Sequence, residues 1–143
     1  MNTFQHNKKS EQVKNVFNQV FDKYDLMNDL MSAGMHRIWK KQFINWLNPQ
    51  KKTKLIDVAS GTGDIAQLYL DAISNDGQVY CVDSNKEMLK KSKKKIKKNG
   101  KIKWICSNAE KLPLKNNLFD YYTISFCIRN VNNIDRSLSE AYR

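Results

Sequence analysis

The sequence predicts an α/β protein built on a parallel, doubly wound sheet. Beyond Pro49, short apolar runs alternate with stretches of helical periodicity. This alternation is typical of parallel strands joined by right-handed helical crossovers. A length of 143 residues leaves room for one ordinary domain. The composition, 41% hydrophobic and 27% charged, is that of a globular protein and excludes a disordered or collagen-like chain.

The strands follow from short apolar runs and the helices from apolar residues at helical spacing. We expect strands over residues 55–59, 78–83, 102–106 and 119–127. A helix should follow the first strand, a lysine-rich helix the second, and a last helix should begin near Asn133.

The region before Pro49 has a different pattern. Apolar residues between Val13 and Tyr24 recur at helical spacing and predict a helix over residues 11–24. Trp39, Phe43 and Leu47 predict a second helix over residues 36–47. The residues between these helices are too polar for a core and too apolar for a plain linker.

The net charge of +11 is concentrated in one segment. Residues 86–103 hold ten lysines and one glutamate, whereas the rest of the chain has 15 basic and 13 acidic residues. Met88, Leu89, Ser92 and Ile96 recur at helical spacing there, so we expect an amphipathic helix with a solvated lysine face. Binding of this face to an anionic membrane surface or to nucleic acid is the alternative.

Several classes of protein are excluded. No apolar run approaches the roughly 18 residues of a membrane span, and the N-terminus lacks the apolar core of a secretory signal. Cys81, Cys106 and Cys127 are widely spaced and lie in strand-like stretches, so we expect reduced core thiols, without a disulfide framework or a metal site. We therefore expect a cytoplasmic protein, and peripheral contact with the inner membrane is compatible with this expectation.

The first strand leads into a glycine-rich turn with the geometry of a nucleotide site. Asp57 lies in the strand, Gly61 and Gly63 follow it, and Asp83 closes the second strand 20 residues beyond Gly63. The glycines permit a tight turn with close backbone approach, and an acidic residue at the end of the second strand can bind a ribose diol.

Two ligand classes share this layout. Gly61, Gly63 and Ala66 satisfy the G-x-G-x-x-A pattern of dinucleotide sites. Asp57 and Asp64, however, place carboxylates where a pyrophosphate would be repelled. Asp57 would instead attract an ammonium group. S-adenosylmethionine, which carries a ribose, an adenine and an ammonium, therefore fits better.

The motifs resemble those of class I S-adenosylmethionine-dependent methyltransferases. Within that class, residues 24–39 are similar to the signature of the ubiquinone and menaquinone biosynthesis C-methyltransferases, through Tyr24, Asp25, Met27, Asn28, Met31, Ser32, His36 and Trp39. The resemblance implies a Rossmann-like sheet in the order 3-2-1-4, which is incomplete relative to the family. It also implies a helical lid or substrate segment over residues 1–50 and a cofactor-binding domain over residues 51–143.

The family pattern implies which residues contact the cofactor. Matched residue by residue, these are Thr62, Asp83, Asn108, Ala109 and Ser125. Asp83 would take the ribose and the Asn108 amide would pair with the adenine edge. Asp57, Gly61 and Gly63 complete the predicted cofactor site.

Methylation of a quinol carbon needs a group that ionises or stabilises the phenol. The resemblance implies that Arg129 and Asn130 have this role, and phenolate stabilisation is favoured because arginine stays protonated. His36 is the alternative base. Structural roles are the alternatives, with Arg129 paired to Asp135 or Glu140 and His36 a structural histidine.

The predicted function is methylation of a polyprenyl benzoquinol in ubiquinone biosynthesis, of demethylmenaquinol in menaquinone biosynthesis, or of both. The expected partner is a lipid-soluble quinol, with no specific nucleic acid, and self-association is left open. The alternatives are a methyltransferase acting on RNA or another small molecule, and an inactive cofactor-binding fragment. Because the sequence stops where the family continues, we expect an exposed edge on the fourth strand and no turnover by the isolated chain.

Overall fold

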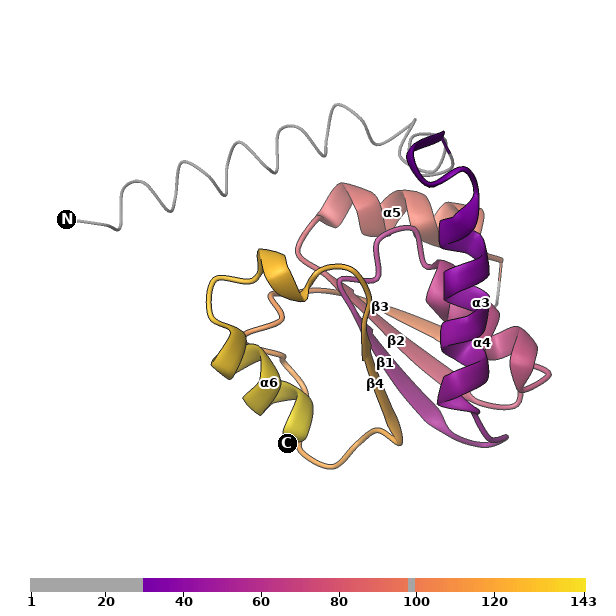
Figure 1. The fold of residues 1–143 in the computed structure, drawn as a ribbon. Coiled ribbons are helices and arrows are strands. Elements are labelled where there is room, and N and C mark those ends of the chain that lie inside the picture. Colours follow the sequence, from indigo (N-terminus) through magenta and orange to yellow (C-terminus); the bar gives the residue numbers. More distant parts are fainter. Residues whose placement is uncertain (1–29, 98–99) are drawn as a thin grey trace. The chain divides into compact units, whose positions relative to one another are not determined.

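The computed structural model describes residues 30–97 and 100–143 (Figure 1). The chain separates into two compact units, residues 1–39 and 40–143. Helix α3 (Met35–Leu47) runs from the first unit into the second, in agreement with the helix expected over residues 36–47. The helix expected over residues 11–24 lies outside the described residues.

The larger unit contains a four-stranded parallel sheet in the order β3-β2-β1-β4. The strands are β1 (Lys54–Val58), β2 (Gln78–Asp83), β3 (Ile102–Cys106) and β4 (Tyr121–Ile124). The predicted α/β class and the 3-2-1-4 order are confirmed. The register sets Asp57 opposite Cys81 on one side and opposite Thr123 on the other.

Helices α4 (Asp64–Ala72) and α5 (Lys86–Lys95) lie on the same face of the sheet as the second half of α3 (Figure 1). The main core forms between these helices and the strands. It is built from Ile44, Leu55, Ile65, Ala66, Tyr69, Leu70, Ile73, Val79 and Cys81. Because both faces of an inner parallel strand are covered, β1 is almost wholly buried.

Helix α6 (Ile134–Tyr142) lies on the opposite face (Figure 1). A second cluster there joins Ile56, Val58 and Val82 to Leu112 of the loop between β3 and β4. Asn133 caps α6, because its side chain accepts the N–H of Arg136 at 2.9 Å. The last helix therefore begins where the sequence predicts it.

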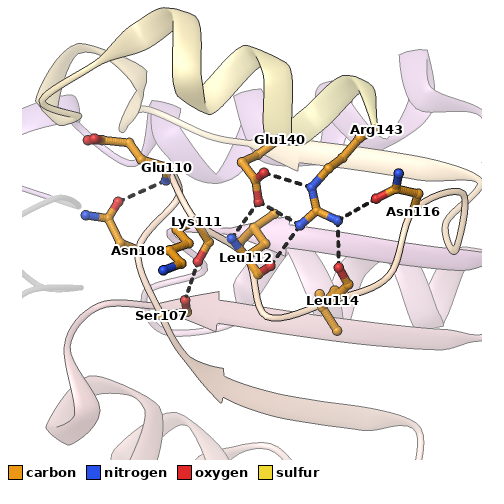
Figure 2. A network of polar contacts seen from close by, with 9 residues as sticks. All are labelled: Ser107, Asn108, Glu110, Lys111, Leu112, Leu114, Asn116, Glu140 and Arg143. Carbon is orange, nitrogen blue, oxygen red and sulfur yellow. Dashed lines mark hydrogen bonds and ion pairs between the residues drawn. The ribbon is translucent and has the colours of Figure 1, made fainter.

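A polar network fastens the end of α6 to the loop between β3 and β4 (Figure 2). The guanidinium of Arg143 donates to the carbonyl oxygens of Leu112 at 2.8 Å and Leu114 at 2.6 Å. Glu140 accepts the N–H of Leu112 at 2.6 Å and pairs with Arg143 at 2.7 Å. These contacts fix the path of the loop that leads from β3 to β4.

The fourth strand is shorter than the 119–127 expected from its apolar run. Phe126 has a φ of 61°, which reverses the extended path, and residues Ile128–Asn130 form a 3-10 turn. The first strand likewise ends at Val58, because Ala59 has a φ of 55°. The first strand therefore has the predicted length but is displaced by one residue, whereas the apolar pattern overestimated the length of the fourth.

The three cysteines differ in how deeply they are buried. All three are free thiols, and Cys81 is buried in β2. Cys106 is exposed and Cys127 is half-buried beyond β4, so the expectation of three core thiols was wrong for these two. Cys106 ends β3, which is an edge strand of the described sheet.

Candidate functional site

The carboxyl ends of the four strands bring most of the predicted site residues to one edge of the sheet. Thr62 follows β1, Asp83 ends β2, Asn108 follows β3, and Ser125 follows β4. Because the strands are parallel, these ends share one edge, which is where open α/β sheets bind ligands. The strand order places β1, which carries the glycine turn, between β2 and β4.

The two glycines of the turn have different surroundings. Both have a left-handed backbone conformation, with a φ of 53° at Gly61 and of 79° at Gly63. A Cβ at Gly61 would meet nothing within 4 Å, whereas a Cβ at Gly63 would lie 2.6 Å from Cδ1 of Ile96 and 3.1 Å from Cη2 of Trp104. Gly61 therefore borders open space, and Gly63 permits α5 and β3 to pack against the turn.

Asp83 is held by the backbone. Its Oδ2 accepts the N–H of Gly61 and its Oδ1 the N–H of Asn85, both at 2.9 Å. Burial raises the pKa of Asp83, although the hydrogen bonds from Asn85, Gly61 and Ser84 oppose the rise. The carboxylate thus ties the glycine turn to the start of α5 and has a fixed orientation.

Asp57 is a buried carboxyl group with one oxygen unpaired. It is 1% exposed, and its Oδ1 accepts the hydroxyl of Thr123 at 2.8 Å. Within the described part of the chain its Oδ2 has no hydrogen-bond partner. Burial raises the pKa of Asp57 to about 7, against the lowering effect of the Thr123 hydrogen bond. An ammonium group beside Oδ2 would satisfy the unpaired oxygen and favour its ionised form.

Asp64 begins α4 and forms an ion pair. Its Oδ2 lies 2.7 Å from Nζ of Lys40, which is on α3. Burial opposes ionisation of Asp64, but pairing with Lys40, aided by Lys95, holds its pKa below the usual range. An ionised carboxylate at the start of α4 would repel a pyrophosphate, which agrees with the reasoning from the sequence.

Asn108 and Ala109 lie in the loop that follows β3, and Figure 2 shows the Asn108 side chain in this loop. Oδ1 of Asn108 accepts the N–H of Glu110 at 3.0 Å, and Ser107 donates to the carbonyl oxygen of Lys111 at 2.9 Å. The Asn108 side chain is therefore oriented by its own loop. Its amide nitrogen is the group that adenine recognition would use.

The predicted catalytic residues fall into both units. Arg129 and Asn130 are exposed in the turn beyond β4, where the Asn130 N–H donates to the carbonyl of Cys127 at 2.8 Å. Glu140, one of the two acids considered as a partner of Arg129, pairs with Arg143. His36 belongs to the unit of residues 1–39, where its Nδ1 lies 3.0 Å from Oγ of Ser32.

Two polar residues with contacts at the site were absent from the sequence-based site. Thr123 binds Asp57 across the sheet, and Ser92 of α5 donates from its Oγ to the carbonyl oxygen of Gly61 at 2.8 Å. Each is a lone hydroxyl on an otherwise apolar surface, Thr123 in a strand and Ser92 on the buried side of a helix. A polar residue in such a position is the signal that could have identified both.

Solved structures with a similar fold define the class of the domain. A SAM-dependent methyltransferase from Aquifex aeolicus aligns with a TM-score of 0.61 and 22% identity, over 70% of this chain and 55% of that one. An arsenic(III) S-adenosylmethionine methyltransferase from Chlamydomonas reinhardtii aligns with a TM-score of 0.60 and 23% identity, over 65% and 35%. The sheet and its glycine turn thus have the class I methyltransferase fold.

Sequence comparison gives the family. Residues 5–143 match the ubiE/COQ5 methyltransferase family, and the chain belongs to this family. The ubiquinone/menaquinone biosynthesis C-methyltransferase UbiE of Rickettsia typhi is 48% identical over 99% of this chain. The same enzyme of Brucella abortus is 47% identical over 96%. The chain spans 59% of the Rickettsia typhi relative and 53% of the Brucella abortus relative.

No helix in the described part of the chain has the length and apolar character needed to cross a membrane.

Proposed function

We propose that the chain binds S-adenosylmethionine at the carboxyl edge of its sheet and serves methyl transfer to a ring carbon of a polyprenyl quinol. Membership of the ubiE/COQ5 family and the names of its relatives support this reaction class. The unpaired, buried Oδ2 of Asp57 is the observation that carries the proposal. A dinucleotide would bring a pyrophosphate towards this group, whereas S-adenosylmethionine brings an ammonium.

The residues of the edge fit this ligand. Asp83 would accept hydrogen bonds from the ribose hydroxyls, the Asn108 amide would bind the adenine, and Asp57 would face the ammonium. The open space beside Gly61 admits a ligand close to the backbone. Thr62, Ala109 and Ser125 complete the proposed contacts. When bound, S-adenosylmethionine supplies a methyl group on a positively charged sulfur.

The methyl acceptor is a ring carbon, so electron density must be driven into the ring from a phenol oxygen. Arg129 keeps its positive charge at neutral pH and would stabilise the phenolate that forms. Asn130, beside it, would orient the phenol oxygen by hydrogen bonding. His36 is the alternative proton acceptor, and its ring nitrogen lies within hydrogen-bond distance of Ser32.

Replacement of Arg129 tests the proposed chemistry. The assay is transfer of labelled methyl from S-adenosylmethionine to a demethylated quinol in membrane extract. The protein is residues 1–143 joined to the part of the Rickettsia typhi relative that this chain does not cover. We expect Arg129→Gln to lower kcat by about 100-fold or more, since one charged stabiliser of the transition state is lost. Affinity for S-adenosylmethionine should change less than about threefold.

Two controls accompany this assay. Arg136→Gln removes the same charge from the exposed surface of α6 and should leave kcat unchanged. The 143-residue chain alone should show no turnover, because β4 forms the outer edge of the described sheet. Methylation of RNA in preference to the quinol would contradict the proposed substrate, and full activity of Arg129→Gln would contradict the role of Arg129.

The state of Asp57 predicts a pH dependence of cofactor binding. Because its pKa is about 7, the ionised form that attracts an ammonium is gained as the pH rises through neutrality. Affinity for S-adenosylmethionine should therefore increase over this range. Thr123→Val removes a hydrogen bond that lowers this pKa, so the midpoint should move to higher pH. Calorimetric titration at a series of pH values measures both effects.

Thr123→Ser is the matched control, because it keeps the hydroxyl that binds Oδ1 of Asp57. The other charges that act on Asp57 are those of Asp83, Lys40 and Asp64, and both variants retain them. An affinity that is independent of pH in the wild type, or a midpoint that is the same in Thr123→Val and Thr123→Ser, would disprove the placement of the ammonium at Asp57.

A further inference from the structure

The exposed side of α5 and the residues directly after it form a dense positive surface, here termed the lysine face. Met88, Leu89, Ser92 and Ile96 are 4%, 5%, 2% and 8% exposed and define the buried side. The one acidic residue of this helix, Glu87, pairs with Lys90 at 2.8 Å. The exposed residues that make up the lysine face are Lys86, Lys90, Lys91, Lys93, Lys94, Lys95 and Lys97.

Helix stability accounts for only some of these lysines. Lys93, Lys94 and Lys95 lie in the last turn, where positive charge is favourable to the helix dipole. Lys86 lies in the first turn, where positive charge is unfavourable. Lysines three and four positions apart, such as Lys86 and Lys90, also repel each other. The charge density of the lysine face therefore exceeds what the helix itself requires.

We propose that the lysine face docks on the surface of an anionic lipid bilayer. The proposal rests on the proposed function, because a polyprenyl quinol resides in a bilayer and the enzyme must reach it there. Charge complementarity is the physical basis, since juxtamembrane clusters of four to eight basic residues bind anionic headgroups. No large apolar residue of α5 is exposed, so the attachment is electrostatic and reversible by salt.

The residue types favour a bilayer over a nucleic acid. Residues 86–97 contain neither an arginine nor an aromatic residue. Sites for nucleic acid commonly use the planar fork of arginine for phosphates and bases, and aromatic rings for stacking. A lysine ammonium is a point charge, which suits headgroups that move relative to one another and offer no fixed geometry.

The buried side of α5 connects the lysine face to the proposed cofactor site. Ser92 donates to the carbonyl oxygen of Gly61, and Ile96 lies against Gly63. Asn85, which caps the helix, donates its N–H to Asp83. Docking would therefore hold the glycine turn about 10 Å from the headgroups, the diameter of one helix with its side chains. A quinol that partly leaves the bilayer could then reach the cofactor edge.

The test measures binding of the 143-residue chain to vesicles by sedimentation. The vesicles contain phosphatidylglycerol and phosphatidylcholine in equal parts, or phosphatidylcholine alone. The test variant carries Lys86→Gln, Lys93→Gln, Lys94→Gln and Lys97→Gln. The control variant carries Lys51→Gln, Lys52→Gln, Lys111→Gln and Lys115→Gln, which remove the same charge from exposed positions elsewhere. A third variant replaces the four test lysines by arginine.

We expect the wild type to bind only the anionic vesicles and to be released by high salt. The test variant should lose about 100-fold in binding, the control variant less than about threefold, and the arginine variant should bind as the wild type does. Inorganic phosphate should displace the protein no better than chloride of equal ionic strength. Equal losses in the two glutamine variants, displacement specific to phosphate, or tighter binding to single-stranded RNA than to vesicles would overturn the proposal.

Binding of S-adenosylmethionine separates this proposal from the proposed function. The test variant should retain wild-type affinity for the cofactor, since none of the four lysines belongs to the proposed site. Vesicle binding without cofactor binding would leave the docking surface standing and refute the proposed function. Cofactor binding without vesicle binding would refute the docking surface and leave the proposed function standing.

Discussion

Replacing Asp83 by alanine is expected to lower affinity for S-adenosylmethionine by about 10- to 150-fold. This loss corresponds to about 1.5 to 3 kcal/mol for hydrogen bonds to a charged acceptor. Asp83 ends β2 and is held in one orientation by the N–H groups of Gly61 and Asn85, so little ordering would be needed when the ribose binds. Calorimetric titration with S-adenosylmethionine measures the loss.

The control for Asp83→Ala is Asp135→Ala, which removes an exposed carboxylate in the first turn of α6. It should bind the cofactor with wild-type affinity. Asp83→Ala also removes the acceptor of the Gly61 N–H, so thermal unfolding must be measured beside the titration. Unchanged affinity of a folded Asp83→Ala protein would show that the ribose binds elsewhere.

Alanine at Gly63 is expected to affect mainly stability, and alanine at Gly61 mainly cofactor binding. Gly63→Ala should lower the free energy of unfolding by about 2 to 4 kcal/mol, and the Tm by roughly 10 °C, because the new Cβ clashes with Ile96 and takes an unfavourable φ. Gly61→Ala has the unfavourable φ without a clash, so it should cost only about 1 kcal/mol. Its Cβ projects into the space that the ligand would fill, so affinity for S-adenosylmethionine should fall at least about tenfold.

Thermal unfolding followed by circular dichroism, together with titration of each folded variant, distinguishes the two roles. Gly77, which directly precedes β2, offers a useful comparison. In Gly77→Ala the new Cβ would lie 2.6 Å from the carbonyl oxygen of Thr53. It should destabilise the fold as Gly63→Ala does. A Gly61→Ala variant with full cofactor affinity would show that the ligand does not approach the turn.

The strands and the starts of the helices could be predicted because their signals are local, whereas the 3-2-1-4 order of the sheet was implied by the family resemblance. Strands β2 and β3 have the predicted bounds, and Asn85 and Asn133 cap their helices as short polar residues before a helical stretch commonly do. The end of β4 could not be predicted in this way. The left-handed conformation of Phe126 is one that apolar residues rarely adopt, and nothing in the neighbouring sequence indicates it.

Sequence motifs identified the candidate residues at the sheet edge, but they could not predict the contacts that orient these residues. The bond from Thr123 to Asp57 joins residues 66 positions apart, and that from Ser92 to Gly61 spans 31. Such pairs depend on strand register and helix rotation, which a periodic pattern does not specify. The sequence pattern also could not indicate that Glu140 pairs with Arg143 and not with Arg129. This pairing depends on the loop of Leu112 and Leu114, whose backbone groups bind both side chains.

Hydrogen exchange of the backbone amides, measured with and without S-adenosylmethionine, tests whether the carboxyl edge of the sheet binds a methyl donor. We expect the ligand to slow exchange at five residues, with no change in α6 and none caused by NADH: Gly61, Thr62, Asn108, Ala109 and Ser125. Protection of the same amides by NADH but not by S-adenosylmethionine, or protection confined to other segments, would contradict a methyl-donor site at the carboxyl edge of this sheet.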